Sequence, residues 1–487
     1  MEFEPVIGLE VHAQLKTNSK IFCSCSTHFG EDPNSNICPV CTGQPGVLPV
    51  LNKRVVELIV KAGIAAHCSI SPHSIFARKH YFYPDLPKNY QISQYEAPVC
   101  ENGYLNIKIN DKTKKIGITR IHLEEDAGKL LHMIGSRVIE GSLVDFNRTG
   151  IPLIEIVSEP DINFPEECYE YLISLKQILE YMEISDCNME EGKLRCDANI
   201  SLRKKGDKKL GVKTELKNMN SFKAVKEAVF YEIERQREIL SAGGTIVQET
   251  RLWSSDRKIT ETMRTKEEAH DYHYFPEPDL IPLELKEDFI KNVKLTIGEL
   301  PKDKSDRFVK ELGLSEYDAG VLTANRNIAA FFEKTLNHLD SENFALNEKA
   351  KMASNYLTSE ILGRLNKAKL EISTSPINPE NLAHLIGYLL RGDISNKIAK
   401  SVLDELFTTS KSVKEIIKEK GLKQITDSKI LEKYILEAIQ DNPQAVQQYL
   451  EGKEKALGAL VGHIMKKTNG QANPQLINNL LKEKIRQ

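Results

Sequence analysis

Polar and apolar residues alternate along five short segments in the first half of the chain, a pattern typical of β-strands that bury one face. In residues 7–15 the odd positions are apolar or small, and Glu10, His12 and Gln14 share the opposite face. The other segments are residues 119–125, 194–203, 212–217, and a fifth that leads from 145–148 into 153–157. The polar positions of three of them are Arg120, His122, Glu124, Arg195, Asp197, Asn199, Ser201, Lys213, Glu215 and Lys217.

If these strands share one sheet, one of its faces combines carboxylates with cationic and imidazole groups. The residues concerned are Glu10, Glu124, Asp197, Glu215, His12, Arg120 and Lys213. Such a face could hold a divalent metal ion and phosphate. A solvated face of an antiparallel sheet alternates in the same way, so the pattern alone leaves both interpretations open.

The composition changes near residue 290. All nine cysteines and the strand patterns precede this point, and the sequence after it reads as almost wholly helical. Two long helices are predicted in the first part, at 166–181 and from the N-cap Ser221 to Ala242. We therefore predict an α+β fold: a domain with a mixed or antiparallel sheet at 1–292, a helical domain at 293–408 and a small helical tail domain at 409–487.

Bulk properties narrow the class of protein. The 66 Lys and Arg residues nearly balance 69 Asp and Glu residues, so the chain has no global basic signature for nucleic acid, although a local basic patch remains compatible. The first residues lack the pattern of a signal peptide, and no apolar run reaches the length of a membrane span. An odd number of cysteines without a secretory signal favours a reduced, cytoplasmic setting.

Four cysteines lie close together in the spacing C-x-C-x12-C-x2-C, at Cys23, Cys25, Cys38 and Cys41. Four thiolates could close a tetrahedral zinc site, which would brace the fold because no coordination position stays open. His28 lies inside the loop as a substitute ligand. The alternative is a folded loop with thiols that bind no metal.

Residues 78–90 contain both cations and aromatic residues, among them Lys79, Lys88, Tyr81, Tyr83 and Tyr90. This combination is typical of sites that bind single-stranded RNA ends. An aromatic core loop with lysines on its rim would look similar. Residues 122–129 place three acids before Gly128 and Lys129, so the acids could hold Mg²⁺ while Lys129 meets phosphate. A charged turn at the sheet edge is the alternative. No phosphate-binding P-loop and no hydrolase nucleophile motif is present.

Long motifs resemble the B subunits of the aspartyl/glutamyl-tRNA amidotransferases. The resemblance covers essentially the whole chain and is carried by residues 6–15, 38–41, 81–95, 120–129, 147–161, 185–197, 215–222 and 442–484. His80 and His273 depart from the family pattern, which usually has Asn and Arg at these positions. Neither departure removes a proposed metal ligand, but both change residues that make local contacts.

The resemblance implies a catalytic cradle domain that uses ATP to phosphorylate the side-chain carboxylate of Glu-tRNA(Gln) or Asp-tRNA(Asn), after which ammonia gives the amide. Together with the strand faces it suggests a Mg²⁺ site made by Glu10, His12, Glu124 and Glu215, with Glu125, Glu155 and Asp197 as nearby alternates. Lys79, Lys88, Lys129 and Arg148 would neutralise phosphates of ATP or the tRNA end. Tyr81, Tyr83 and Tyr90 would wall the CCA end of the tRNA.

The resemblance also implies partners. A glutaminase of the amidase type would supply ammonia as the A subunit, and a small C subunit would complete a heterotrimer. The tail would bind tRNA through Lys453, Lys455, Lys466, Lys467, Lys482 and Lys484. Two other functions stay open: a non-catalytic, zinc-braced protein that docks tRNA within such a complex, and a metal-dependent nuclease that uses the acids.

Overall fold

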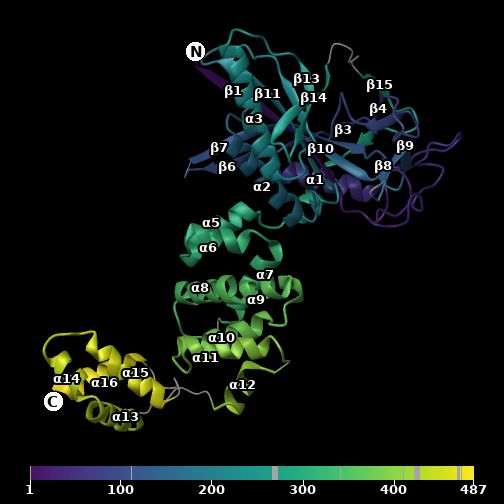
Figure 1. The fold of residues 1–487 in the computed structure, drawn as a ribbon. Helices are drawn as coiled ribbons and strands as arrows, with labels where there is room; N and C mark the ends of the chain where they lie inside the picture. The colour runs from purple at the N-terminus through teal and green to yellow at the C-terminus, as the bar shows by residue number, and fades with distance from the viewer. Residues whose placement is uncertain are drawn as a thin grey trace. The chain divides into compact units, whose positions relative to one another are not determined.

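The computed structural model describes residues 2–110, 112–135, 137–265, 272–339, 342–409, 411–421, 428–468, 472 and 474–486. Contacts within the chain divide it into two compact units, Met1–Leu300 and Pro301–Gln487. The first combines strands with a few helices and the second is helical (Figure 1). The predicted α+β class is therefore confirmed. Within the described ranges no helix has both the length and the apolar character needed to cross a bilayer.

A large sheet organises the first unit, and among the described residues it has nine strands in the order β14-β13-β12-β11-β1-β10-β7-β6-β2. Its neighbours are antiparallel except for the parallel pair β12 and β13. The strands are β1 (Phe3–Gln14), β2 (Ser69–Ile70), β6 (Cys100–Ile109), β7 (Lys112–Glu125), β10 (Pro152–Ser158), β11 (Leu194–Lys204), β12 (Thr214–Lys217), β13 (Glu249–Ser254) and β14 (Ile259–Thr265).

All five predicted strand segments contribute to this sheet, but two of them begin later than expected. Residues 212 and 213 precede β12, and the fifth segment joins the sheet only at Pro152. Asp145 ends another strand, and its carboxylate accepts a hydrogen bond from the backbone N–H of Asn147 at 3.0 Å. This side-chain turn, followed by Gly150 at φ +81°, breaks the strand between 145 and 152.

Helices cover the apolar face of the sheet. They are α1 (Lys53–Ala65), α2 (Pro165–Tyr181) and α3 (Phe222–Ser241), and all three pack against its strands (Figure 1). On β1 the alternate residues Leu9, Val11 and Ala13 are completely buried. The two helices predicted from the sequence are confirmed as α2 and α3, and the Ser221 hydroxyl caps α3 by accepting the Ala224 N–H at 3.1 Å. The opposite face carries the polar positions of these strands.

Smaller sheets flank the large one. Among the described residues they are a three-stranded sheet of β15 (His273–Pro276), β4 (Ala77–His80) and β5 (Tyr90–Ser93), a pair of β16 (Leu283–Glu284) with β3 (His73–Ser74), and a hairpin of β8 (Lys129–Ile134) with β9 (Arg137–Asp145). Helix α4 (Glu287–Leu295) follows and contacts α1. The two positions that depart from the family pattern, His80 and His273, lie directly opposite each other in β4 and β15.

The second unit contains two separate hydrophobic cores within its described residues. The first core runs from Phe308 to Ile417 and the second from Leu431 to Leu481. The first is built by α5 (Pro301–Leu312), α6 (Glu316–Thr323), α7 (Arg326–His338), α8 (Leu346–Asn355), the π-helix η2 (Tyr356–Ile361), α9 (Leu362–Ala368), the short 3₁₀ helix η3 (Ile372–Thr374), α10 (Pro379–Leu390), α11 (Asn396–Leu406) and α12 (Val413–Glu419). The second is built by α13 (Ser428–Asp441), α14 (Pro443–Leu450), α15 (Ala456–Lys467) and α16 (Pro474–Arg486).

Gly63 allows α1 to approach β6 closely. A Cβ atom at this position would lie 2.4 Å from Cys100 Sγ and 2.7 Å from Ile70 Cδ1. We expect Gly63→Ala to destabilise the first unit by about 1–3 kcal/mol through overpacking. Urea unfolding and hydrogen exchange in α1 measure this effect. The control is Gly320→Ala in α6, where a Cβ meets open space and alanine should stabilise the helix by up to about 1 kcal/mol. Equal stability of the two variants would contradict this prediction.

Candidate functional site

Two carboxylates and an imidazole converge on the polar face of the sheet. His12 of β1 lies opposite Glu155 of β10, and Glu155 lies opposite His122 of β7. Glu124 projects from β7 on the same face two residues beyond His122. The His12 Nε2 atom is 3.3 Å from a Glu155 oxygen and 3.5 Å from a Glu124 oxygen. One ligand atom each from His12, Glu124 and Glu155 lies within 4.8 Å of the others, and we call these three residues the carboxylate group.

Burial and mutual charge perturb this group strongly. Burial raises the pKa of Glu124 to about 7, against the opposing effect of His12. Burial also opposes ionisation of Glu155, but the hydrogen bond from His12 and the nearby positive charges, Lys79 among them, together outweigh it and lower the pKa of Glu155. Burial lowers the pKa of His122 to about 4, so this neighbouring imidazole is neutral at pH 7. A carboxyl that titrates near neutrality beside an ionised one is typical of functional sites.

The carboxylate group fits a divalent cation. Carboxylate oxygens are hard ligands, and two of them gathered at one buried point require a counter-charge. In the described structure this charge comes from His12, whose pKa is raised by Glu155 and Glu124 against the effect of burial. Lys79 of β4 adds a second cation, and the same two carboxylates raise its pKa although burial lowers it. A bound cation would be held by Glu124, Glu155 and His12.

The predicted set of Glu10, His12, Glu124 and Glu215 is not gathered at one point among the described residues. Glu10 and Glu215 belong to a second acidic group farther along the face, together with Asp197 and Lys217. Lys217 forms ion pairs with Asp197 and with Glu215, the latter at 3.2 Å. Glu10 accepts a hydrogen bond from Asn199 at 2.8 Å, and its pKa is raised by burial and by Glu155, Glu215 and Asp197. The Thr250 hydroxyl donates to Glu215 at 2.7 Å.

A cavity of about 270 Å³ adjoins this second group. Its polar lining consists of Glu10, Ser158, Asn199, Ser201 and Lys213. Gly8, which has no side chain, also lines the cavity. Val6, Leu210 and Pro160 add apolar walls. An apolar pocket with a few convergent polar groups is the usual form of a small-molecule site.

Arg195 is a site residue that the sequence alone does not assign to cofactor binding. It lies opposite His12 on β11, and its guanidinium donates to Asp126 Oδ1 at 2.9 Å. Its Nε atom is buried without a hydrogen-bond partner among the described residues. Burial lowers the pKa of Arg195 but Asp126 and Glu124 raise it, so the charge is retained. The alternation of residues 194–203 places Arg195 on the polar face, so the pattern contains the signal.

The other predicted phosphate contacts lie elsewhere. Lys88 forms a buried ion pair with Glu125, whose carboxylate also accepts the Ile92 N–H at 2.9 Å. Arg148 donates to the backbone carbonyls of Ala127 and Gly128 and so braces that loop. Lys129 is exposed at the start of the β8–β9 hairpin. Only Lys79 among the predicted cations lies over the carboxylate group.

Two of the predicted tyrosines, Tyr81 and Tyr90, lie near Lys79 and Lys88. The Lys79 ammonium is 4.8 Å from the centre of the Tyr272 ring and 6.0 Å from that of Tyr81. Tyr90 packs beneath Arg78 at 4.4 Å and lies 5.4 Å from the Lys88 ammonium. Tyr83 is exposed. Tyr81 and Tyr272, whose rings are 5.5 Å apart, therefore form an aromatic wall beside Lys79.

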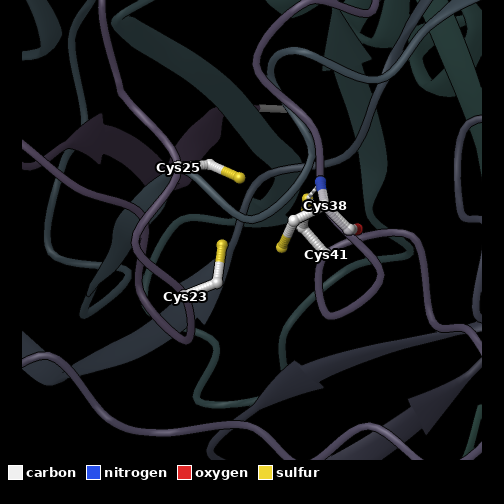
Figure 2. A group of neighbouring side chains, drawn as sticks. All are labelled: Cys23, Cys25, Cys38 and Cys41. Atoms are coloured by element: carbon white, nitrogen blue, oxygen red, sulfur yellow. Dashed lines mark hydrogen bonds between the residues drawn. The ribbon is translucent and has the colours of Figure 1, made fainter.

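The four cysteines Cys23, Cys25, Cys38 and Cys41 converge, with one sulfur from each within 4.8 Å of the others (Figure 2). The backbone N–H of Cys38 donates to Cys41 Sγ at 3.2 Å. His28 does not belong to this cluster; its ring instead meets Glu31 at 3.1 Å. The arrangement is a possible four-cysteine metal site, and four soft sulfur donors within tetrahedral reach fit zinc.

Two family models match the chain. The GatB/GatE catalytic domain matches residues 5–291, and the GatB domain matches residues 331–485. The B subunit of the aspartyl/glutamyl-tRNA(Asn/Gln) amidotransferase from Carboxydothermus hydrogenoformans is 54% identical over 484 residues, 99% of each chain. The chain belongs to the GatB/GatE family. The B subunits of the same enzyme from Persephonella marina and Moorella thermoacetica are each 52% identical over the full length of both chains. The resemblance found in the sequence is confirmed, and the catalytic-domain match contains both the carboxylate group and the cysteine cluster.

Substitutions can separate the two acidic groups. We expect Glu124→Gln and Glu155→Gln each to weaken Mn²⁺ binding at least about tenfold, because each removes a charged oxygen ligand. Glu215→Gln should weaken it less than about threefold, since Glu215 lies outside the carboxylate group. Electron paramagnetic resonance titration of the chain with Mn²⁺ alone measures the affinities. Glu159→Gln is the control, because this carboxylate accepts the Thr119 hydroxyl and lies outside both acidic groups. A larger loss from Glu215→Gln would move the metal site to the second group.

Proposed function

We propose that this chain is the component of a tRNA-dependent amidotransferase that activates the substrate carboxylate. ATP would phosphorylate the side-chain carboxylate of Glu-tRNA(Gln), Asp-tRNA(Asn) or both, and ammonia would displace the phosphate to leave the amide. The observation that carries the proposal is the convergence of His12, Glu124 and Glu155 on the polar face of the sheet, in a chain that belongs to the GatB/GatE family.

Phosphoryl transfer needs positioning and charge neutralisation more than covalent help from the protein. A Mg²⁺ ion held by His12, Glu124 and Glu155 would neutralise charge on the transferred phosphoryl group. Lys79 and Arg195 flank this point from the smaller sheet and from β11, so they would add positive charge on two sides. The cavity beside Glu10 would hold the rest of the nucleotide, with Asn199, Ser201 and Lys213 offering hydrogen bonds.

The aminoacylated tRNA end would approach from the side of the smaller sheet. Tyr81 and Tyr272 offer ring faces on which a terminal base can stack, and Lys79 between them can meet a phosphate or the carboxylate. Tyr83 is exposed and would contact the next nucleotide. The substrate carboxylate would then attack the γ-phosphoryl group of ATP beside His12, Glu124 and Glu155, and ADP would leave. A carboxylate alone is a poor acylating agent, and the acyl phosphate provides the leaving group that ammonia requires.

Ammonia would come from partner proteins, because the sequence contains no recognisable hydrolase nucleophile motif. We propose that glutamine is hydrolysed by an amidase-type A subunit, with a small C subunit to complete a heterotrimer. A zinc ion on Cys23, Cys25, Cys38 and Cys41 would brace the loop that carries them and leave no open coordination position. Reduced thiols suit a cytoplasmic location.

The helical tail offers further tRNA contacts. In the described part of the tail, Lys467 is held by Glu437 and Asp441, and Lys484 by Glu432. Lys453 and Lys455 are exposed in the connection that precedes α15, so we propose that they meet tRNA phosphates first. Lys466 and Lys482 are also exposed on the last two helices.

The activation step can be tested without glutamine. In a complex whose glutaminase nucleophile has been removed, ammonium should still support amide formation on Glu-tRNA or Asp-tRNA. Glu124→Gln or Glu155→Gln in this chain should reduce ADP release and amide formation at least about 100-fold, because charge stabilisation of the transferred phosphoryl is lost. Lys16→Met, which changes an exposed lysine paired with Asp186, is the control.

If Glu124→Gln and Glu155→Gln both left ADP release and amide formation unchanged, the chemistry would belong to a partner and this chain would only dock the tRNA. Shortened tRNA without ADP would instead indicate a nuclease. A gel shows whether the tRNA has been shortened, and a separation of the nucleotides measures the ADP.

The tail contacts can be tested by salt dependence. We expect Lys453→Ala with Lys455→Ala to weaken tRNA binding and to reduce the slope of log affinity against log salt by about 1–2. Filter binding at several salt concentrations gives both quantities. The control is Lys467→Ala, whose ammonium is already paired with Glu437 and Asp441 and should change the slope less. An equal change in both proteins would refute this choice of lysines.

A further inference from the structure

Lys20 is a completely buried lysine beside the cysteine cluster. Its ammonium donates to the backbone carbonyl of Asn36 at 2.8 Å, to that of Phe146 at 3.4 Å and to Cys41 Sγ at 3.6 Å. Its backbone N–H donates to the carbonyl of Cys25 at 3.0 Å. One residue therefore contacts both halves of the cluster, through its main chain and through its side chain.

The ammonium of Lys20 has no carboxylate partner within ion-pair distance among the described residues, because its three acceptors are two carbonyls and a sulfur. Two carboxylates line the small cavity that Lys20 also lines, those of Glu125 and Asp279. Glu125 is paired with Lys88, and Asp279 with Arg78 at 3.0 Å. Burial of a charge without a counter-charge is strongly unfavourable, so a negative charge close to the Lys20 ammonium would stabilise it.

The cysteine cluster supplies this charge if it binds zinc as proposed above. Four thiolates around Zn²⁺ carry a net charge of about −2, and the cluster lies directly at the end of the Lys20 side chain. Groups that hydrogen-bond to metal ligands orient them and tune the affinity of the site. An ammonium that donates to Cys41 Sγ would offset half of the net charge and hold that sulfur toward the metal.

We propose that Lys20 is a positioning residue of the zinc site, which donates a hydrogen bond to Cys41 Sγ and compensates the charge of the metal–thiolate cluster. This inference rests on the zinc site of the proposed function. The role is bracing, and Lys20 does not touch the substrates.

The test compares zinc retention in full-length variants. Lys20→Met removes the charge and the donor at similar volume, and it should release zinc to a chelator at least about tenfold faster than the unaltered chain. Lys20→Arg keeps the charge and should retain zinc better than Lys20→Met. Lys16→Met is the matched control, because Lys16 is an exposed lysine a few residues away that pairs with Asp186. Far-ultraviolet circular dichroism confirms that each variant is folded.

A second measurement needs no variant. With NMR-active cadmium in the site and isotopically labelled lysine, one ammonium signal should be protected from solvent exchange and coupled to the metal across the N–H···S hydrogen bond. Zinc bound with equal retention in Lys20→Met, or the absence of such coupling in the cadmium-loaded chain, would overturn the role of Lys20 and leave the zinc site intact. A chain that takes up no metal at all would overturn both the zinc site and this inference.

Discussion

The register of β1 between β10 and β11 is the constraint on which the site depends. Buried residues on one face, such as Leu9 and Val11, must meet the helices, so a shift by one position would expose them and is strongly disfavoured. With that face secured, His12 is aligned with Glu155 on one side and with Arg195 on the other. Hydrophobic burial on the far face thus holds an electrostatically unfavourable set of groups together on the near face.

Part of this arrangement can be predicted from the sequence. Period-two alternation identifies which residues of a strand share a face, and it correctly places Glu10, His12, Glu124, Arg195 and Asp197 on one side of a common sheet. Alternation cannot say which residues of neighbouring strands lie opposite each other, because that depends on strand order and register. From the sequence, Glu155 therefore ranks below Glu10 and Glu215, although pairing of β1 with β10 brings Glu155 to His12.

Contacts between distant loops are beyond the sequence for a similar reason. Lys88 and Glu125 suggest separate roles in the sequence, yet they neutralise each other in a buried pair. The sequence suggests that Arg148 binds phosphate, but its guanidinium donates hydrogen bonds to the backbone carbonyls of Ala127 and Gly128. Charge type and spacing are visible in a sequence, whereas the partner that satisfies a charge depends on the folded chain. The four cysteines are the opposite case, because their short spacing already restricts them to one neighbourhood.

The two sites differ in how they treat buried charge, and this difference matches their proposed roles. The pKa of Glu124 is raised to about 7 while that of Glu155 is lowered, so the charge of the carboxylate group can change when a cation and phosphates bind. The cysteine cluster has a buried ammonium at hydrogen-bond distance from one sulfur. A site that exchanges ligands in each turnover needs an adaptable charge, whereas a brace is better served by a permanent one. The same logic explains why Lys79 borders the first site beside aromatic rings, while Lys20 is enclosed by carbonyls and sulfur.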